Sequence, residues 1–265
     1  MKKLIFFDID GTIISEDKEH IVPDSMYKAL HRLQENGHLC FVNTGRAWAE
    51  VDKKIRDMGF DGYVCGCGTH IRYQDQVLFS KSIPFALGNA ILEDLRKNHL
   101  EWLLEGTDYV YYSAGEYQSR ISLFRQEHEK QIPDAFRILA EGEEKNIVFD
   151  KFCICLTDDS HFEEFRQTYQ NELTFIDRKK RFYEIIPNGY SKASGMQFLE
   201  NHFHIDHKDT IAIGDSTNDL AMLTYAGCSI AMGGCAPELL PVADYVTLPL
   251  LEDGVYHAME HFGLL

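Results

Sequence analysis

Short apolar runs alternate with longer helix-like stretches at both ends of the chain. The short runs predict buried strands, and the stretches between or after them predict helices. The predicted strands cover residues 3–8, 38–43, 62–66 and 209–213. The predicted helices cover residues 23–36, 47–58, 191–203 and 216–225. Because this alternation is typical of βαβ units, we expect an α/β fold with a doubly wound, Rossmann-like parallel sheet.

The middle of the chain has a different pattern. From Ser82 to Ile186 the strand-like runs are longer and alternate in character, as in residues 146–156, and helical stretches lie near 85–98 and 160–170. This pattern predicts an antiparallel α+β domain inserted into the first one. The core is then discontinuous in sequence. The expected bounds are 1–81 and 187–265 for the core and 82–186 for the inserted domain.

Two carboxylates follow the first predicted strand. The apolar run Leu4–Phe7 leads directly into the sequence DIDGT, which places Asp8 and Asp10 at the strand end. Gly11 breaks the strand, so Asp10 can turn away from Asp8 instead of sharing its face. One acid can then attack as a nucleophile while the other gives and takes a proton. On this segment alone, an ordinary Asp-Gly turn is the alternative.

Three later segments favour the chemical interpretation. The second predicted strand ends in NTGR (43–46), whose hydroxyl and backbone amides suit a phosphate. The sequence PNGYSK (187–192) opens a helix-like stretch and offers an ammonium group near its first turn. The strand at 209–213 leads into the acidic loop GDSTND (214–219), whose oxygen ligands suit Mg²⁺. Ligands of such sheets bind beyond the carboxyl ends of the strands, where all these motifs except the lysine lie.

In this order, the four motifs resemble the haloacid dehalogenase (HAD) superfamily, and specifically its Cof-type phosphatases. The resemblance covers nearly the whole chain, because residues 230–233, 243–247 and 252–255 also look like the Cof-type C-terminal pattern. Cof-type proteins carry a large cap between the threonine and lysine motifs, where the inserted domain is predicted here. One departure is Cys67, which stands where the family usually has asparagine. The contribution of that asparagine near the active site is therefore in doubt.

The resemblance implies a role for each motif residue. Asp8 is the implied nucleophile and Asp10 the implied acid and base. Asn218 and Asp219 are implied to orient the metal shell or the phosphate, in roles that the motif does not separate. An acid two residues after the nucleophile is typical of phosphatases and phosphomutases in this superfamily. The implied phosphate-binding residues are Thr44, Gly45, Arg46, Lys192 and Asn218, and the implied Mg²⁺ ligands are Asp8, Asp10, Asp215 and Asp219.

The composition excludes several classes of partner. The 265 residues fit one large or two moderate domains. A count of 42 acidic and 26 basic residues gives a formal net charge of −16. This charge argues against nucleic acid or an anionic membrane as a partner, because polyanions are bound by clustered Lys and Arg. We expect a small phosphorylated metabolite, which would meet local positive charge from the metal and from Lys192 or Arg46.

The protein is expected to be cytoplasmic. The uninterrupted apolar run after the N-terminal lysines, Leu4–Phe7, is shorter than the ~7–15 residues of a secretory signal. No run approaches the ~20 apolar residues of a membrane span. The seven cysteines favour a reducing compartment. The pairs Cys65/Cys67 and Cys153/Cys155 lack the usual spacing of zinc ligands, so buried free thiols are expected.

Three other segments have both a chemical and a simpler interpretation. The histidines at 202, 204 and 207 could bind a metal, but a solvated connection before a strand explains them. The basic run Arg178–Arg181 could hold a second anionic group of a substrate or form a solvated turn. The aromatic run Tyr109–Tyr112 is more typical of sheet packing than of base stacking. The simpler interpretation is preferred for each.

The expected function is Mg²⁺-dependent hydrolysis of small phosphomonoesters through an aspartyl-phosphate. Sugar phosphates, nucleotides and cofactor phosphates all remain open as substrates, because a fold does not determine its substrate. A phosphotransferase or phosphomutase on the same core, and a catalytically idle binding protein, are the alternatives. A signalling receiver domain shares the acid, threonine and lysine chemistry, but it is about half as long and has no inserted cap. The oligomeric state is not predicted.

Overall fold

The chain divides into two compact units in the computed structural model, which describes residues 2–17, 19–140, 142–143 and 147–265. The first unit consists of Met1–Gly45, Asp57–Leu78 and Ser191–Leu265. The second unit consists of Arg46–Arg56 and Phe79–Tyr190. The short segment Arg46–Arg56 therefore joins the second unit, although both of its flanks belong to the first.

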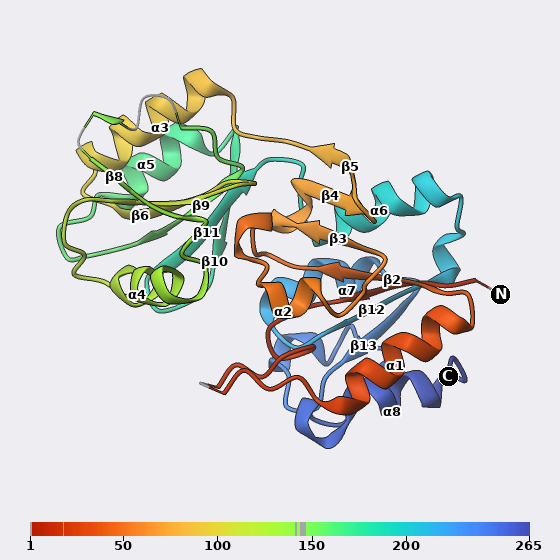
Figure 1. Cartoon of the computed structure of the whole chain (residues 1–265). Helices are drawn as coiled ribbons and strands as arrows, with labels where there is room; N and C mark the ends of the chain where they lie inside the picture. The colour runs from red at the N-terminus through yellow and green to blue at the C-terminus, as the bar shows by residue number, and fades with distance from the viewer. Residues whose placement is uncertain (1, 18, 141, 144–146) are drawn as a thin grey trace. The chain divides into compact units, whose positions relative to one another are not determined.

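The first unit is built on a mostly parallel sheet (Figure 1). Its strand order is β14-β13-β12-β1-β2-β3-β4-β5. From β14 to β3 neighbouring strands are parallel, and β4 pairs with β3 in the antiparallel direction. The strands are β1 (Leu4–Phe7), β2 (Leu39–Asn43), β3 (Gly62–Cys65), β4 (His70–Tyr73), β5 (Gln76–Ser80), β12 (Thr210–Gly214), β13 (Cys228–Ala231) and β14 (Tyr245–Val246). All four predicted core strands are confirmed, and so is the doubly wound α/β fold class.

The central strands are buried apolar runs because helices cover both faces of the sheet. Helices α1 (Asp24–Glu35) and α8 (Gly254–His261) pack against each other on one face, and α6 (Lys192–Phe203) and α7 (Leu220–Tyr225) pack on the other (Figure 1). Phe7 is level with Val42 in β2 and with Ile213 in β12. The residues that follow these three positions therefore emerge at one edge of the sheet.

The helix predicted over residues 47–58 is wrong in its extent. The segment forms a 3₁₀ turn at Trp48–Glu50 and a separate short helix, α2 (Lys53–Arg56). Val51 between them has extended backbone angles, φ −71° and ψ 106°. The Asp52 carboxylate accepts a hydrogen bond from the Ile55 amide at 3.0 Å and so caps the second piece. Asp52 therefore starts a second helix, and the predicted single helix is divided into two short pieces.

The second unit is a six-stranded, mostly antiparallel sheet with the order β10-β11-β9-β6-β7-β8. Helices α3 and α5 cover one face, and α4 lies on the other (Figure 1). The strands are β6 (Glu101–Glu105), β7 (Val110–Ser113), β8 (Phe136–Leu139), β9 (Lys151–Cys155), β10 (Leu173–Asp177) and β11 (Phe182–Pro187), and the helices are α3 (Phe85–Lys97), α4 (Ile121–Gln131) and α5 (Phe162–Tyr169). The run predicted over 146–156 is a strand only in β9, and residue 146 lies outside the described residues.

A buried ionic cluster lies within the second unit. Lys151 is 2.9 Å from Glu105 and 2.7 Å from Glu184, and the side chains of all three are at most 6% exposed. The Cys153 thiol donates to Glu105 at 3.2 Å. Burial raises the pKa of Glu105 well above its ordinary value, and repulsion from the Glu50 carboxylate adds to this. Glu50 belongs to the segment Arg46–Arg56, so this segment is held by polar contacts inside the second unit.

His128 next to this cluster gives the second unit a predicted acid sensitivity. Its Nδ1 lies 2.8 Å from the Tyr112 hydroxyl and its Nε2 lies 3.5 Å from Glu50. Burial lowers the pKa of His128 from 6.5 to about 4. Between these two pKa values His128 is protonated in the unfolded chain and neutral in the folded chain. The stability of the fold therefore falls as pH drops from about 6.5 towards 4. The two pKa values differ by about 2.5, which corresponds to about 3 kcal/mol at most.

We expect His128→Asn to remove this dependence of folding stability on pH. Both tryptophans, Trp48 and Trp102, lie in the second unit, so their fluorescence during urea unfolding reports on that unit. The wild type should lose stability relative to the variant between pH 7 and pH 4. Effects of the nearby glutamates are common to both proteins. Parallel pH curves for the two would contradict the prediction.

Candidate active site

Four of the predicted site residues meet at the carboxyl edge of the parallel sheet in the first unit. Asp8 follows β1, Thr44 follows β2, and Asp215 follows β12. Lys192 is the first residue of α6. Asp8 is 2% exposed, Thr44 1% and Lys192 1%, whereas Asp215 is half-buried. The matched register of the three strands is what brings these motifs together.

Lys192 is bound to two carboxylates. Its Nζ donates to Asp8 Oδ1 and to Asp219 Oδ1, each at 2.6 Å, and both acids are buried. The helix starts here because the Ser191 hydroxyl caps it, accepting from the Ser194 amide at 3.1 Å. Burial opposes the charge on Lys192, but Asp219 and Asp8 outweigh burial and raise its pKa. The ammonium is therefore a fixed positive charge beside Asp8.

The acidic groups outnumber this single cation. Carboxylate oxygens of Asp8, Asp215 and Asp219 lie within 4.8 Å of one another. Burial, followed by repulsion from Asp219, raises the pKa of Asp8 to about 7, although Lys192 lowers it in part. Burial and repulsion from Asp8 raise the pKa of Asp215 to about 8. A divalent cation would relieve this repulsion, and an all-oxygen donor set fits Mg²⁺.

Asp219 also holds the loop that carries Asp215. Its Oδ2 accepts from the amides of Asp215 at 2.9 Å and Ser216 at 3.0 Å, while its Oδ1 accepts from Lys192. A Cβ at Gly214 would lie 2.5 Å from the Asp219 side chain, so only glycine allows this approach. Asp219 thus orients both the ammonium and the loop. Its assignment as a direct metal ligand stays a prediction.

The chain turns at Gly11, directly after the two predicted catalytic acids. Gly11 has a left-handed φ of +81°, and a Cβ there would lie 2.4 Å from Asp215 Oδ2. The amides of Ile13 and Ile14 both bond the Ile9 carbonyl, which closes the turn. Asp10 is half-buried. Gly11 therefore provides both the strand break and the room that Asp215 needs.

Thr44 is fixed by backbone bonds on both sides. Its amide donates to the Val64 carbonyl at 2.8 Å, and its carbonyl accepts from the Cys67 amide at 3.1 Å. Cys67 has a left-handed φ of 53° and is 2% exposed. Asparagine tolerates this conformation better than cysteine, which gives a physical reason for asparagine at such a position. The bond to Thr44 uses only the backbone of Cys67, so it survives the departure from the family pattern.

The three remaining predicted phosphate-binding residues lie in the acidic loop, at the end of a segment of the first unit, and in the second unit. Asn218 accepts a hydrogen bond from the Ser216 hydroxyl within the acidic loop. Gly45 ends the first segment of the first unit. Arg46 belongs to the second unit, where it pairs with Asp52 at 3.5 Å and donates to the Glu50 carbonyl at 3.3 Å. Roles of these three residues in phosphate binding stay predictions.

A sequence model of the family described as haloacid dehalogenase-like hydrolase matches residues 5–259. The chain belongs to this family. The recognition of a Cof-type HAD phosphatase from four motifs is therefore confirmed. The expectation that the chain is an enzyme is confirmed with it.

Relatives of this HAD-like hydrolase extend over its whole length. YkrA from Bacillus subtilis (strain 168) is 31% identical over 275 residues, which cover 99% of this chain and 98% of YkrA. The HMP-PP phosphatase of Cronobacter sakazakii (strain ATCC BAA-894) is 26% identical, with 99% and 94% covered. Among solved structures, the HAD subclass IIB sugar phosphatase BT4131 has a TM-score of 0.83 at 25% identity, with 99% of this chain and 100% of that chain covered.

The histidines at 202, 204 and 207 all lie in the part of the chain that the structure describes, and they do not form a group of potential metal ligands there. Within the described residues, the aspartates at 8, 215 and 219 are the only group of three or more potential ligands close enough to bind one ion. His207 instead contacts Glu200 at 3.1 Å. Tyr112 packs against Phe136 in the second unit. All seven cysteines are free thiols, and five of them are buried.

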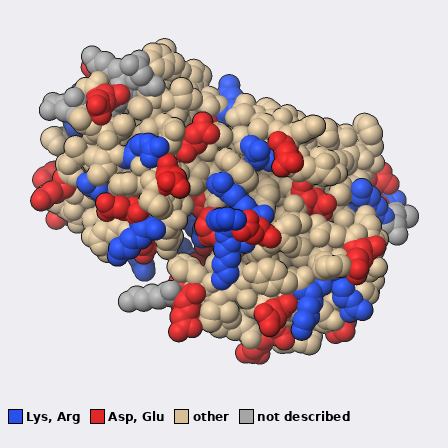
Figure 2. All heavy atoms as spheres, in the orientation of Figure 1, with Lys and Arg blue, Asp and Glu red and all other residues tan. Residues whose placement is uncertain are grey.

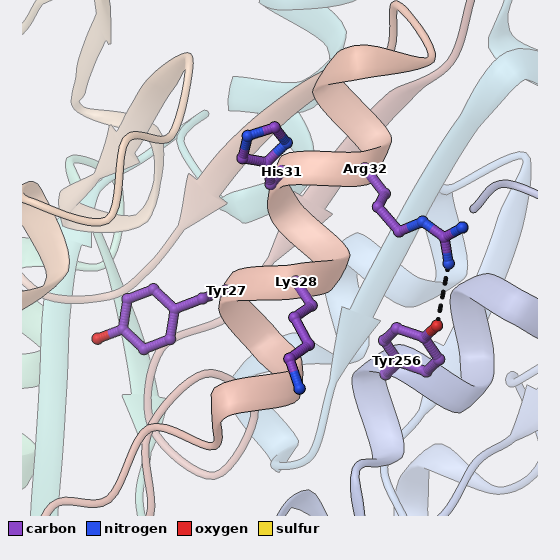
Figure 3. A pocket seen from close by; sticks show the side chains of 5 residues that line it. All are labelled: Tyr27, Lys28, His31, Arg32 and Tyr256. Carbon is purple, nitrogen blue, oxygen red and sulfur yellow. Dashed lines mark hydrogen bonds between the residues drawn. The ribbon is translucent and has the colours of Figure 1, made fainter.

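A hollow of about 440 Å³ over α1 is a separate feature (Figure 3). It is lined by Tyr27, Lys28, His31, Arg32 and Tyr256. Figure 3 shows Tyr27 pointing to one side of the helix and Arg32, bonded to Tyr256, pointing to the other. These side chains do not converge on one point, and none is a carboxylate. The hollow therefore lacks the groups of the candidate active site.

On the face drawn in Figure 2, Lys and Arg are scattered among Asp and Glu and do not gather into one broad basic area. Among the helices of the described residues, none is long and apolar enough to cross a membrane.

Proposed function

We propose that this HAD-like hydrolase is a Mg²⁺-dependent phosphatase that hydrolyses small phosphomonoesters through an aspartyl-phosphate on Asp8. The observation that carries the proposal is the contact of one buried ammonium, Lys192, with Asp8 and Asp219 at 2.6 Å each, beside the half-buried Asp215. A nucleophile, a cation for phosphate oxygens and a set of metal ligands then share one edge of the sheet. The proposed location is the cytoplasm.

The metal ligands would be the Asp8 and Asp215 carboxylates and the Asp10 backbone carbonyl, with Asp219 completing the acidic group. When bound, Mg²⁺ supplies charge neutralisation for the phosphate oxygens. The raised pKa values of Asp8 and Asp215 support this ligand set, because burial and mutual repulsion both disfavour the charged carboxylates until a cation is bound.

The first half-reaction transfers the phosphoryl group to the protein. An Asp8 oxygen attacks phosphorus in line, the bond from phosphorus to the leaving oxygen breaks, and Asp10 gives that oxygen a proton. Lys192 and Thr44 hold the equatorial oxygens, with Lys192 acting as a point charge. In the second half-reaction Asp10 takes a proton from water, the water oxygen attacks phosphorus, and the Asp8 carboxylate leaves. The products are the alcohol and inorganic phosphate.

The proposed substrates are small phosphorylated metabolites. The relatives include proteins named for HMP-PP and for 5-amino-6-(5-phospho-D-ribitylamino)uracil, and the structural neighbour BT4131 is named a sugar phosphatase. These names share a phosphate on a small polar molecule and little else. The division into a catalytic core (1–81 and 187–265) and an inserted cap (82–186) is part of this proposal.

Removal of the metal should abolish activity. Purified protein treated with EDTA and then dialysed should hydrolyse para-nitrophenyl phosphate at the background rate, and added Mg²⁺ should restore hydrolysis. Ca²⁺ is the matched control, since it has the same charge but prefers longer bonds and more ligands, and it should restore much less. A panel of phosphometabolites then ranks substrates. Hydrolysis that survives EDTA, or no hydrolysis of any phosphomonoester with Mg²⁺, would contradict the proposal.

A further inference from the structure

Asn43 is a buried polar residue beside the candidate active site that the motif interpretation leaves without a role. It is the last residue of β2, after the apolar positions Leu39–Val42, and it is 0% exposed. Its Nδ2 donates to the backbone carbonyl of Lys192 at 3.0 Å. A side chain at the end of one strand is thereby bonded to the first residue of α6.

The Lys192 carbonyl does not need the bond from Asn43 in order to have a hydrogen-bond partner. The Lys192 carbonyl opens α6, and the first carbonyl of a helix already accepts from the amide four residues later, here Met196. Asn43 Oδ1 is buried and has no hydrogen-bond partner among the described residues. An apolar side chain of similar size would leave no such oxygen unpaired. The stability of the fold therefore gives no reason for an asparagine here, whereas the geometry of α6 does.

The first turn of α6 is held tightly from other directions too. A Cβ at Gly68 would lie 2.4 Å from the Ser191 carbonyl oxygen, and a Cβ at Gly195 would lie 2.3 Å from Val64. The contact with Asn43 adds a directional bond that joins this turn to the end of the strand that Thr44 follows. Asn43 bonds the backbone carbonyl of Lys192, and the position of that backbone sets where the Lys192 ammonium lies.

We propose that Asn43 is a positioning residue for Lys192: its side-chain amide fixes the first turn of α6, so that the ammonium keeps its place beside Asp8 and in register with Thr44. The inference rests on the proposed function, because it concerns the cation of the same site. Asn43 has no step of its own in the proposed mechanism. Its effect is on the placement of a charge that must match the phosphate oxygens to within a fraction of an ångström.

The first test separates placement from stability. Asn43→Leu should lower kcat/KM for para-nitrophenyl phosphate about 10- to 100-fold, mainly through kcat, as loss of a supporting contact in a site does. The inhibition constant of inorganic phosphate should rise with it, while urea unfolding stays close to that of the wild type. Asn98→Leu is the matched control, since buried Asn98 donates to the Asp94 carbonyl of α3 at 2.8 Å in the second unit. It should change kcat/KM by less than about twofold.

The second test asks whether Asn43 acts through Lys192. In a double-mutant cycle, Asn43→Leu should cause no further loss of kcat/KM or of phosphate inhibition once Lys192→Ala is present. Losses that multiply, or an Asn43→Leu protein as active as the wild type, would overturn the inference. If Asn43→Leu fails to fold, Asn43→Ala carries the same expectation. An inactive wild type would instead overturn the proposed function, so the two failures are distinguishable.

Discussion

Asp8→Asn should abolish turnover while leaving the fold intact. An amide is a poor nucleophile for phosphorus and a weaker metal ligand than a carboxylate, so kcat should fall by roughly 10⁴- to 10⁶-fold, as for other nucleophile deletions. The side chain keeps its size in a site where Asp8 is 2% exposed. It also loses a charge that Asp219 repels, while Lys192 keeps its bond to Asp219. The thermal midpoint should therefore equal or exceed that of the wild type.

Steady-state hydrolysis of para-nitrophenyl phosphate with Mg²⁺ measures this prediction, with circular dichroism to confirm folding. Asp75→Asn is the control, because Asp75 is an exposed carboxylate between β4 and β5 of the same unit. It should keep the wild-type rate. A near-native rate for Asp8→Asn, with contaminating phosphatase excluded, would remove Asp8 from the mechanism.

Asp10→Asn should harm substrates according to their leaving group. A sugar phosphate expels a basic alkoxide that needs a proton, whereas para-nitrophenolate leaves with little help. General acid–base catalysis is typically worth ~10²–10⁴-fold, so the loss for the sugar phosphate should exceed the loss for para-nitrophenyl phosphate by up to that factor. Burial is the main cause of the raised pKa of Asp8, and the Asp10 charge adds to it, which places the Asp10 carboxyl group near the nucleophile.

Specificity constants for the two substrates decide the role of Asp10. Lys192→Ala is the comparison, since its charge acts on phosphate oxygens and should lower both constants by a similar factor. If Asp10→Asn lowered both equally, Asp10 would not be the acid of the first half-reaction.

The core of the fold and the motif positions follow from the sequence for a simple physical reason. Parallel strands covered on both faces are continuous apolar runs, so Leu4–Phe7 and residues 38–43 and 209–213 stand out. Their carboxyl ends share one edge, so the polar residues that follow them had to meet. Lys192 begins a helix, and sequence spacing alone does not show that it contacts both Asp8 and Asp219.

The features that the sequence did not reveal depend on tertiary contacts. Residues 47–58 have helical character, but Asp52 caps a second helix and Ala49 packs in a core cluster of the second unit. Lys151 lies in an otherwise apolar strand, and its two glutamate partners are 46 and 33 residues away in sequence. One feature of the sequence marks Asn43, which is a polar residue at the end of an apolar run. That signal does not identify its partner.

The most direct test of the account is to trap the phosphorylated residue. Borohydride reduces an aspartyl-phosphate to homoserine, which peptide mass spectrometry can locate. Protein quenched during turnover of para-nitrophenyl phosphate with Mg²⁺ should contain homoserine at position 8, more of it in Asp10→Asn if breakdown of the intermediate is slowed, and none in Asp8→Asn or without substrate. Turnover with no modified residue, or modification of a different carboxylate, would contradict the account.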